Sequence, residues 1–161
     1  MEYETVILEM LARIQALEEQ VKELKAQQIP LQKKPLPHRS NTKVTEEMLL
    51  ACYDAGKQAV ASEYADAVAL AEQVHHRTGM NKNNALMTIF GVVALLNGEL
   101  YKRALSGKAT KKYFDLILAD YGKGKLQLAI AAMRKHIDYR RALHHNVDLL
   151  EEICDRYQEM I

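Results

Sequence analysis

Five cations and two aromatic residues lie close together in one short segment of the chain. Residues 102–112 hold five bases and no acid, and a tyrosine stands at each end of them. Lysine and arginine bind phosphate groups, while tyrosine rings stack on bases or sugars. The combination predicts a nucleic-acid-binding surface, with a solvated turn beside helix ends as the alternative. The candidate residues are Tyr101, Lys102, Arg103, Lys108, Lys111, Lys112 and Tyr113.

Histidine spacing argues against a metal site. Four of the six histidines form adjacent pairs, His75-His76 and His144-His145. Neighbouring side chains on a helix point about 100° apart, so the two members of a pair cannot face one ion. No HExxH motif, paired cysteine or acidic cluster completes a ligand set, and we expect no metal and no cofactor. His136 is expected to be a packed histidine with one hydrogen bond.

Catalytic nucleophiles are not evident either. No serine or cysteine has a recognisable base and orienting group in the sequence. Residues 106–108, Ser-Gly-Lys, do not follow the spacing of a phosphate-binding GxxxxGK[ST] loop, and no strand precedes them. Cys52 and Cys154 lack CxxC spacing and fit buried thiols of the cytoplasm. We expect a protein without enzymatic activity, with an unrecognised catalytic cleft as the alternative.

Composition limits the chain to one core with an appendage. Its 161 residues are 48% hydrophobic and carry a formal net charge of +1, which excludes a globally basic, chromatin-like protein. Residues 1–28 hold six acids and three bases, residues 29–43 four bases and no acid, and residues 44–161 fifteen of each. There is no signal-peptide pattern and no run of about 18 apolar residues, so a membrane partner is not expected.

The first 28 residues follow a heptad pattern. From Tyr3 on, apolar residues occupy the a and d positions of four heptads, with β-branched residues at a. This pattern predicts a parallel dimeric coiled coil. A trimer is the alternative because Val6 at g and Leu11 at e widen the seam and residues 13–18 resemble a trimer motif; packing onto the chain's own domain is another. The expected oligomerisation residues are Ile7, Met10, Ile14, Leu17, Val21 and Leu24.

A linker is predicted over residues 29–43. This segment contains all three prolines and no acid, a composition typical of extended, semi-rigid chain. Its bases either are simply solvated or touch a phosphate backbone. They are Lys33, Lys34, Arg39 and Lys43.

Residues 78–101 contain the longest nearly charge-free apolar run. From residue 85 to residue 96 apolar side chains surround the helical wheel, so this helix must be covered on several sides. Asn81 is its expected N-cap and Gly98 its expected end. The glycine-containing joint before it resembles a helix-turn-helix, but an apolar second helix favours a packed helical hairpin over a DNA reader.

Capping residues and glycines indicate where the other helices of residues 44–161 begin and end. We expect Thr45 to cap one helix and Ser62 the next, over residues 63–77. Val68 is expected on the buried side of this second helix. Further helices are expected over residues 111–121, over 125–144 and after Asn146, with Leu128 and Leu149 on the buried sides of the last two. No segment alternates like a strand, so the predicted class is all-α, a compact multi-helix domain behind the coiled coil and linker.

The chain also resembles a small helical domain that precedes HNH nuclease domains in bacterial restriction-type endonucleases. The match covers about 60 residues between Gly79 and Tyr139, and no HNH motif accompanies it. The resemblance implies a module that helps a DNA enzyme to bind or choose its target. The matching residues are Gly79-Met80-Asn81, Ala85, Leu96, Gly98, Tyr101, Arg103, Ala109-Thr110, Tyr113-Phe114, Asp120-Tyr121-Gly122, His136-Ile137 and Tyr139.

Together these patterns predict a non-enzymatic, oligomeric helical binding module. Its first expected partner is DNA or RNA, or a DNA-acting enzyme that it regulates. The alternative is a protein–protein adaptor or inhibitor that captures its partner on a helical groove, which the zero net charge of residues 44–161 favours.

Overall fold

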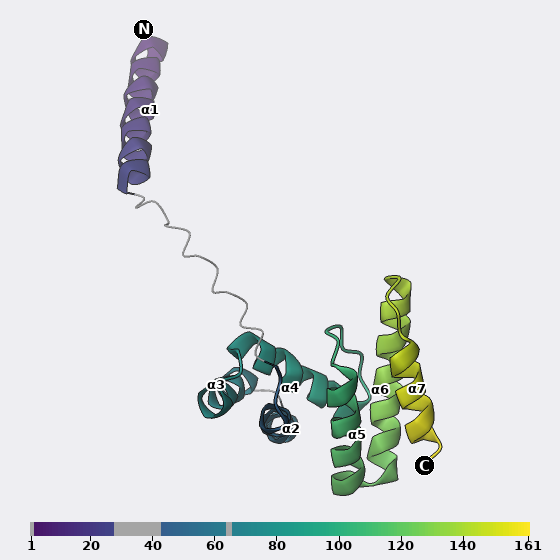
Figure 1. Cartoon of the computed structure of the whole chain (residues 1–161). Coiled ribbons are helices and arrows are strands. Elements are labelled where there is room, and N and C mark those ends of the chain that lie inside the picture. Colours follow the sequence, from purple (N-terminus) through teal and green to yellow (C-terminus); the bar gives the residue numbers. More distant parts are fainter. Residues whose placement is uncertain (1, 28–42, 64–65) are drawn as a thin grey trace. The chain divides into compact units, whose positions relative to one another are not determined.

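The computed structural model describes residues 2–27, 43–63 and 66–161, which contain seven helices and no strand. The all-α prediction is therefore confirmed. The chain divides into two compact units, residues 1–41 and 42–161 (Figure 1). Residues 29–42 of the expected linker, with the bases Lys33, Lys34 and Arg39, lie outside the described residues. The helices are α1 (Glu2–Gln27), α2 (Glu46–Ala61), α3 (Ala67–Thr78), α4 (Lys82–Asn97), α5 (Gly107–Tyr121), α6 (Lys123–Ala142) and α7 (Asp148–Gln158).

In the first unit the structure describes one helix, and the apolar stripe of this helix is uncovered. Helix α1 runs for 26 residues without interruption. Its a and d side chains are between 48% and 83% exposed, the extremes being Val21 and Tyr3. Apolar stripes of this regularity normally lie against another helix.

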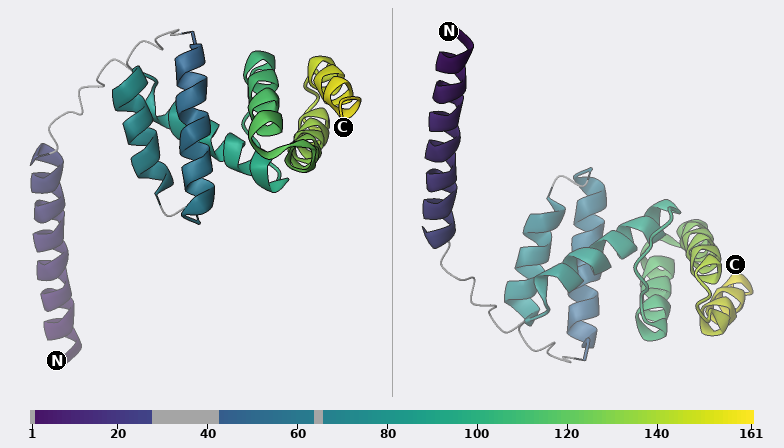
Figure 2. Two further views of the ribbon diagram at one scale, coloured as in Figure 1. Left: turned by 90° about the horizontal axis from the view of Figure 1, so that it is seen from below. Right: turned by 90° about the horizontal axis from the view of Figure 1, so that it is seen from above.

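Helix α4 is the central element of the second unit. It contacts α2 and α3 on one side and α6 on the other. Figures 1 and 2 show α4 passing from the pair α2 and α3 to the group formed by α5, α6 and α7. The prediction of a central helix covered on several sides is confirmed, because eight of its residues are buried.

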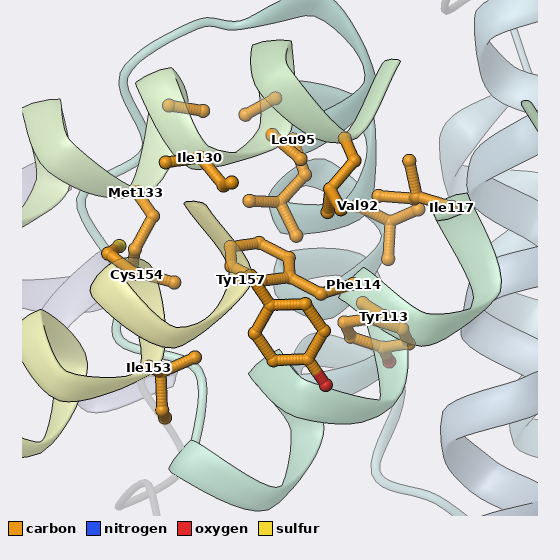
Figure 3. Close-up of a cluster of buried hydrophobic side chains, with 14 of the residues drawn as sticks. Val92, Leu95, Tyr113, Phe114, Ile117, Ile130, Met133, Ile153, Cys154 and Tyr157 are labelled. Carbon is orange, nitrogen blue, oxygen red and sulfur yellow. The ribbon is translucent and has the colours of Figure 1, made fainter. Parts of the chain in front are cut away.

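Two hydrophobic clusters meet along α4. Ala85, Ile89 and Val93 face a cluster built with α2 and α3. Val92 and Leu95 belong to a larger cluster that α5, α6 and α7 complete with the residues drawn in Figure 3. One helix therefore serves as the wall between both parts of the core.

Most of the predicted helix ends are confirmed, with one clear error. Thr45 accepts a hydrogen bond from the backbone N–H of Met48, and Asn81 caps α4 in the same way. Gly98 ends α4 with a left-handed φ of 72°. Ser62 was predicted to start a helix but ends α2, and its hydroxyl donates back to the carbonyl of Ala59.

Further helix starts differ in detail: α3 begins at Ala67 instead of residue 63, and α6 begins at Lys123 instead of residue 125. Helix α5 begins at Gly107 after the N-cap Ser106, four residues before the predicted start at Lys111. Asn146 does accept a hydrogen bond from the backbone N–H of Asp148, at 2.9 Å, although Val147 is the residue directly before α7.

Three predicted core residues are instead exposed. Val68 lies beside the buried stripe of α3 and is 59% exposed. Leu149, in the first turn of α7, is 53% exposed, and Leu128 on α6 is 42% exposed. Each stands at the edge of its helix's apolar face, where residue type alone does not decide burial.

Gly56 allows α2 and α4 to cross closely. It is buried in the interior of α2, where glycine costs helix stability. A Cβ atom at this position would lie 2.5 Å from Cγ1 and 2.8 Å from Cβ of Val92. The absence of a side chain therefore sets the distance between the two helices.

Candidate functional site

The two tyrosines of the predicted nucleic-acid surface are buried. Tyr113 is completely inaccessible and Tyr101 is 7% exposed, so neither ring is free to stack on a base. Tyr113 is one of the buried residues on the inward face of α5, and its ring stacks on the ring of Tyr53 at a centroid distance of 6.1 Å. The prediction that these rings bind nucleic acid is therefore wrong, because both belong to the hydrophobic core.

The five cations lie in two separate places. Lys102 and Arg103 are exposed in the loop that joins α4 to α5. The three lysines of α5 line a shallow hollow together with Glu46 and Asp115. They are Lys108, Lys111 and Lys112.

Only part of this charge is neutralised within the protein. Lys112 forms a salt bridge with Glu46 at 2.5 Å, and this bond holds the pKa of the Glu46 carboxyl below its usual value. Arg103 donates a hydrogen bond to the side-chain oxygen of Asn84 at 2.7 Å. Within the described ranges, no carboxylate forms a salt bridge with Lys108 or Lys111.

The loop also borders an apolar groove that sequence reasoning missed. The groove has a volume of about 350 Å³ and follows the exposed side of α4. Met87, Phe90 and Leu100 line it and remain 38%, 40% and 46% exposed. Lys102 and Arg103 stand at its edge, so apolar and cationic surface adjoin here. This set of residues (Met87, Phe90, Leu100, Lys102 and Arg103) is called the α4 groove below.

Helix α6 holds the loop in position. Lys135 donates a hydrogen bond to the carbonyl oxygen of Gly98 at 2.8 Å, and Lys125 donates one to that of Leu96 at 3.0 Å. The Tyr101 ring stacks on His136 at 4.3 Å between centroids. These contacts fix the segment from which the cations of the α4 groove project.

His136 is a buried base in a nearly closed environment. It is 1% exposed, and its Nδ1 lies 2.6 Å from the carbonyl oxygen of Tyr101. Because a carbonyl only accepts hydrogen bonds, Nδ1 carries the proton in the neutral ring. Its Nε2 has no hydrogen-bond partner among the described residues. Burial, together with the charge of Arg140, lowers the pKa of His136. The expectation of a packed histidine with one hydrogen bond is confirmed.

The protein is expected to lose stability in mild acid because of His136. The unfolded histidine binds a proton near pH 6.5, whereas the folded one resists protonation, so the free energy of unfolding falls as pH drops through that value. Between pH 7.5 and 5.5 the loss reaches up to about 1.4 kcal/mol. Urea unfolding at pH 7.5 and at pH 5.5 measures this loss. The difference in the free energy of unfolding between the two pH values should be smaller in His136→Phe than in the original protein and unchanged in His145→Gln. An unchanged difference in His136→Phe contradicts the assignment.

Neither cysteine is prepared for nucleophilic chemistry. Both are buried free thiols, and burial raises the pKa of Cys52 to about 12 and that of Cys154 to about 11. Their thiolates are therefore scarce at neutral pH. Among the residues that the structure describes, no three histidine, cysteine, aspartate or glutamate side chains gather as a metal site would require.

Comparisons with protein-family models, with curated proteins and with solved structures each gave no match. Within the described part of the chain, no helix has the length and apolar character needed to cross a membrane.

Proposed function

We propose that the protein is a non-enzymatic, self-associating adaptor, in which α1 joins several copies and residues 43–161 of each copy bind a partner protein. The observation that carries the proposal is the uncovered heptad stripe of α1. Its a and d residues Ile7, Ile14 and Leu17 are 55%, 51% and 60% exposed. A second copy of α1 is the partner that an identical repeat fits best.

Flanking residues favour a parallel arrangement. In parallel coils each g position faces the e position five residues later on the partner helix. Here Val6 would face Leu11, both apolar, and Arg13 would face Glu18, of opposite charge. The intrahelical contact of Arg13 with Glu9 is long, at 3.9 Å, and exposed, so it competes weakly.

Light scattering on the full chain tests the assembly. At micromolar concentration the mass should be two or three times that of the 18.3 kDa chain. A mass of one chain at this concentration contradicts the proposal.

A protein partner is favoured by the nature of the surface. Met87, Phe90 and Leu100 expose apolar area in one groove, whereas the rings expected to stack on bases are buried. Exposed aromatic and methionine side chains beside arginine are typical of protein-binding sites. Several copies on one coiled coil would raise the effective concentration of the groove and hence its avidity.

Nucleic acid is the second candidate partner, and one observation favours it. Lys108 and Lys111 lie together on the first turns of α5, and neither forms a salt bridge among the described residues. Phosphate groups bind such cations. The resemblance to the helical domain ahead of HNH nucleases supports the same partner.

Salt dependence tests this candidate. If the cations of α5 bind duplex DNA, Lys108→Gln with Lys111→Gln should flatten the log–log slope of affinity against salt by up to about two, since each phosphate contact contributes about −0.9. Lys112→Gln is the matched control, because Glu46 already neutralises that lysine and a smaller change is expected. Fluorescence anisotropy with labelled duplexes measures the slope. Absence of binding to DNA or RNA at about 50 mM salt, where such contacts are strongest, excludes the candidate.

A further inference from the structure

The α4 groove has the form of a seat for a helix. Its α4 residues Met87, Phe90, Gly91 and Ala94 are spaced at i, i+3, i+4 and i+7. Side chains at this spacing form a ridge along one face of a helix, and a second helix packs against such a ridge. From Met87 to Ala94, seven residues further on, α4 advances about 10 Å, or two turns. In the described residues there is no strand whose edge an extended peptide could join.

The apolar area of the groove is large enough to matter for binding. Met87, Phe90 and Leu100 each keep more than a third of their surface exposed. Covering them removes water from an aromatic ring, a thioether and a leucine, the kinds of side chain that anchor protein interfaces. Binding at the groove would require little rearrangement of the loop after Gly98, because Lys135 and His136 of α6 already hold this loop in place.

The charge of the groove favours an acidic partner. The residues that line it include two bases, Lys102 and Arg103, and one acid, Glu99, which forms no salt bridge with either of them. Lys102 and Arg103 stand at the edge of the groove, and within the described ranges neither forms a salt bridge. Lys102 instead lies 6.0 Å from the centre of the Tyr139 ring. Carboxylates on an incoming helix would meet these two cations without displacing an existing carboxylate.

We propose that the α4 groove binds an acidic amphipathic helix of a partner protein. The apolar face of that helix covers Met87, Phe90 and Leu100, and its acidic side chains pair with Lys102 and Arg103. The inference rests on the proposed adaptor function and specifies the chemical class of its partner.

Selection from a random peptide library tests the proposal. The full chain serves as bait for phage that display random 16-residue peptides. Enriched peptides should be rich in aspartate and glutamate, with apolar residues at i, i+3 or i+4, and i+7. Their affinity for Phe90→Glu should fall at least about tenfold, as expected when a central anchor is lost. Lys102→Glu with Arg103→Glu, two exposed substitutions that leave the core intact, should weaken the same peptides.

The control variant is Val68→Glu. Val68 is an exposed apolar residue of α3 that does not line the groove, so this substitution should leave peptide affinity unchanged. Three outcomes overturn the proposal: no enrichment above phage without bait, enriched peptides without acidic character, and enriched peptides that bind Phe90→Glu as well as the original protein.

The proposed adaptor function can fail separately. A light-scattering mass of one chain would contradict the proposed self-association, but the result of the peptide selection would still test the α4 groove. If the enriched peptides are not acidic but their binding depends on Phe90, the adaptor function is supported and only the proposal of an acidic partner helix is contradicted.

Discussion

Aspartate in place of Ile14 or Leu17 is expected to convert the assembled protein into monomers whose residues 43–161 stay folded. Both residues lie on the a/d stripe of α1, so a carboxylate there would be enclosed by the partner helix without a counter-charge. Enclosing an unpaired charge costs several kcal/mol per site, and each copy contributes one such site. Light scattering should report the mass of a single chain, and the thermal transition of the second unit should be unchanged.

Leu8→Asp is the matched control for this result. Leu8 is on the same helix at position b, outside the seam, and is 67% exposed. Its substitution should leave the mass of the assembly intact. If Leu8→Asp dissociates the protein as readily as Leu17→Asp, the heptad seam is not the interface, and packing of the helix by another face must be considered.

Gly56→Ala is expected to destabilise the second unit although alanine is the better helix former. The added methyl group would overlap Cγ1 and Cβ of Val92, and a β-branched valine has little freedom to move away on a helix. Overpacking of this kind typically costs about 1–3 kcal/mol, against a gain of about 1 kcal/mol in helix propensity. Urea unfolding measures the net change, and the midpoint should move to lower urea.

The same substitution at Gly124 separates the two effects. Gly124 lies in the first turn of α6, and an added Cβ meets nothing within 4 Å. Gly124→Ala should therefore keep the midpoint or raise it, because only the propensity term acts. Equal effects at the two glycines would show that the contact with Val92 is relieved by a small shift of α4.

Local signals were the most reliable part of the sequence. Thr45, Asn81 and Gly98 act on backbone groups within four residues, so their types and positions sufficed to place three helix ends. Ser62 shows the limit of this reasoning. A serine hydroxyl can cap the helix that follows or bond back to the helix that precedes, and here it bonds to Ala59.

The burial of the tyrosines illustrates a different error. Tyr113 stands beside two lysines, and this neighbourhood suggested a surface. Its helical spacing from Ala109 and Ile117, four residues away on either side, places it on the buried face of α5. That signal was present in the sequence, but starting the helix at Lys111 instead of Gly107 concealed it.

The α4 groove could not be read from the sequence at all. Phe90 and Met87 occur within an apolar run, and the sequence predicted only that this helix is covered on several sides. Their exposure depends on the course of the loop after Gly98, which α6 sets through side chains more than 20 residues away. Contacts at this separation leave no periodic trace in the chain.

The position of α4 between two hydrophobic clusters has a consequence for cooperativity. Ile89 supports one cluster and Val92 the other, and both side chains are fully buried on a single helix. If α4 loses its helical form, both clusters lose a wall at once, so neither half of the second unit can open deeply while the other stays closed. A partner seated against α4 would therefore slow the local opening of helices that it never touches.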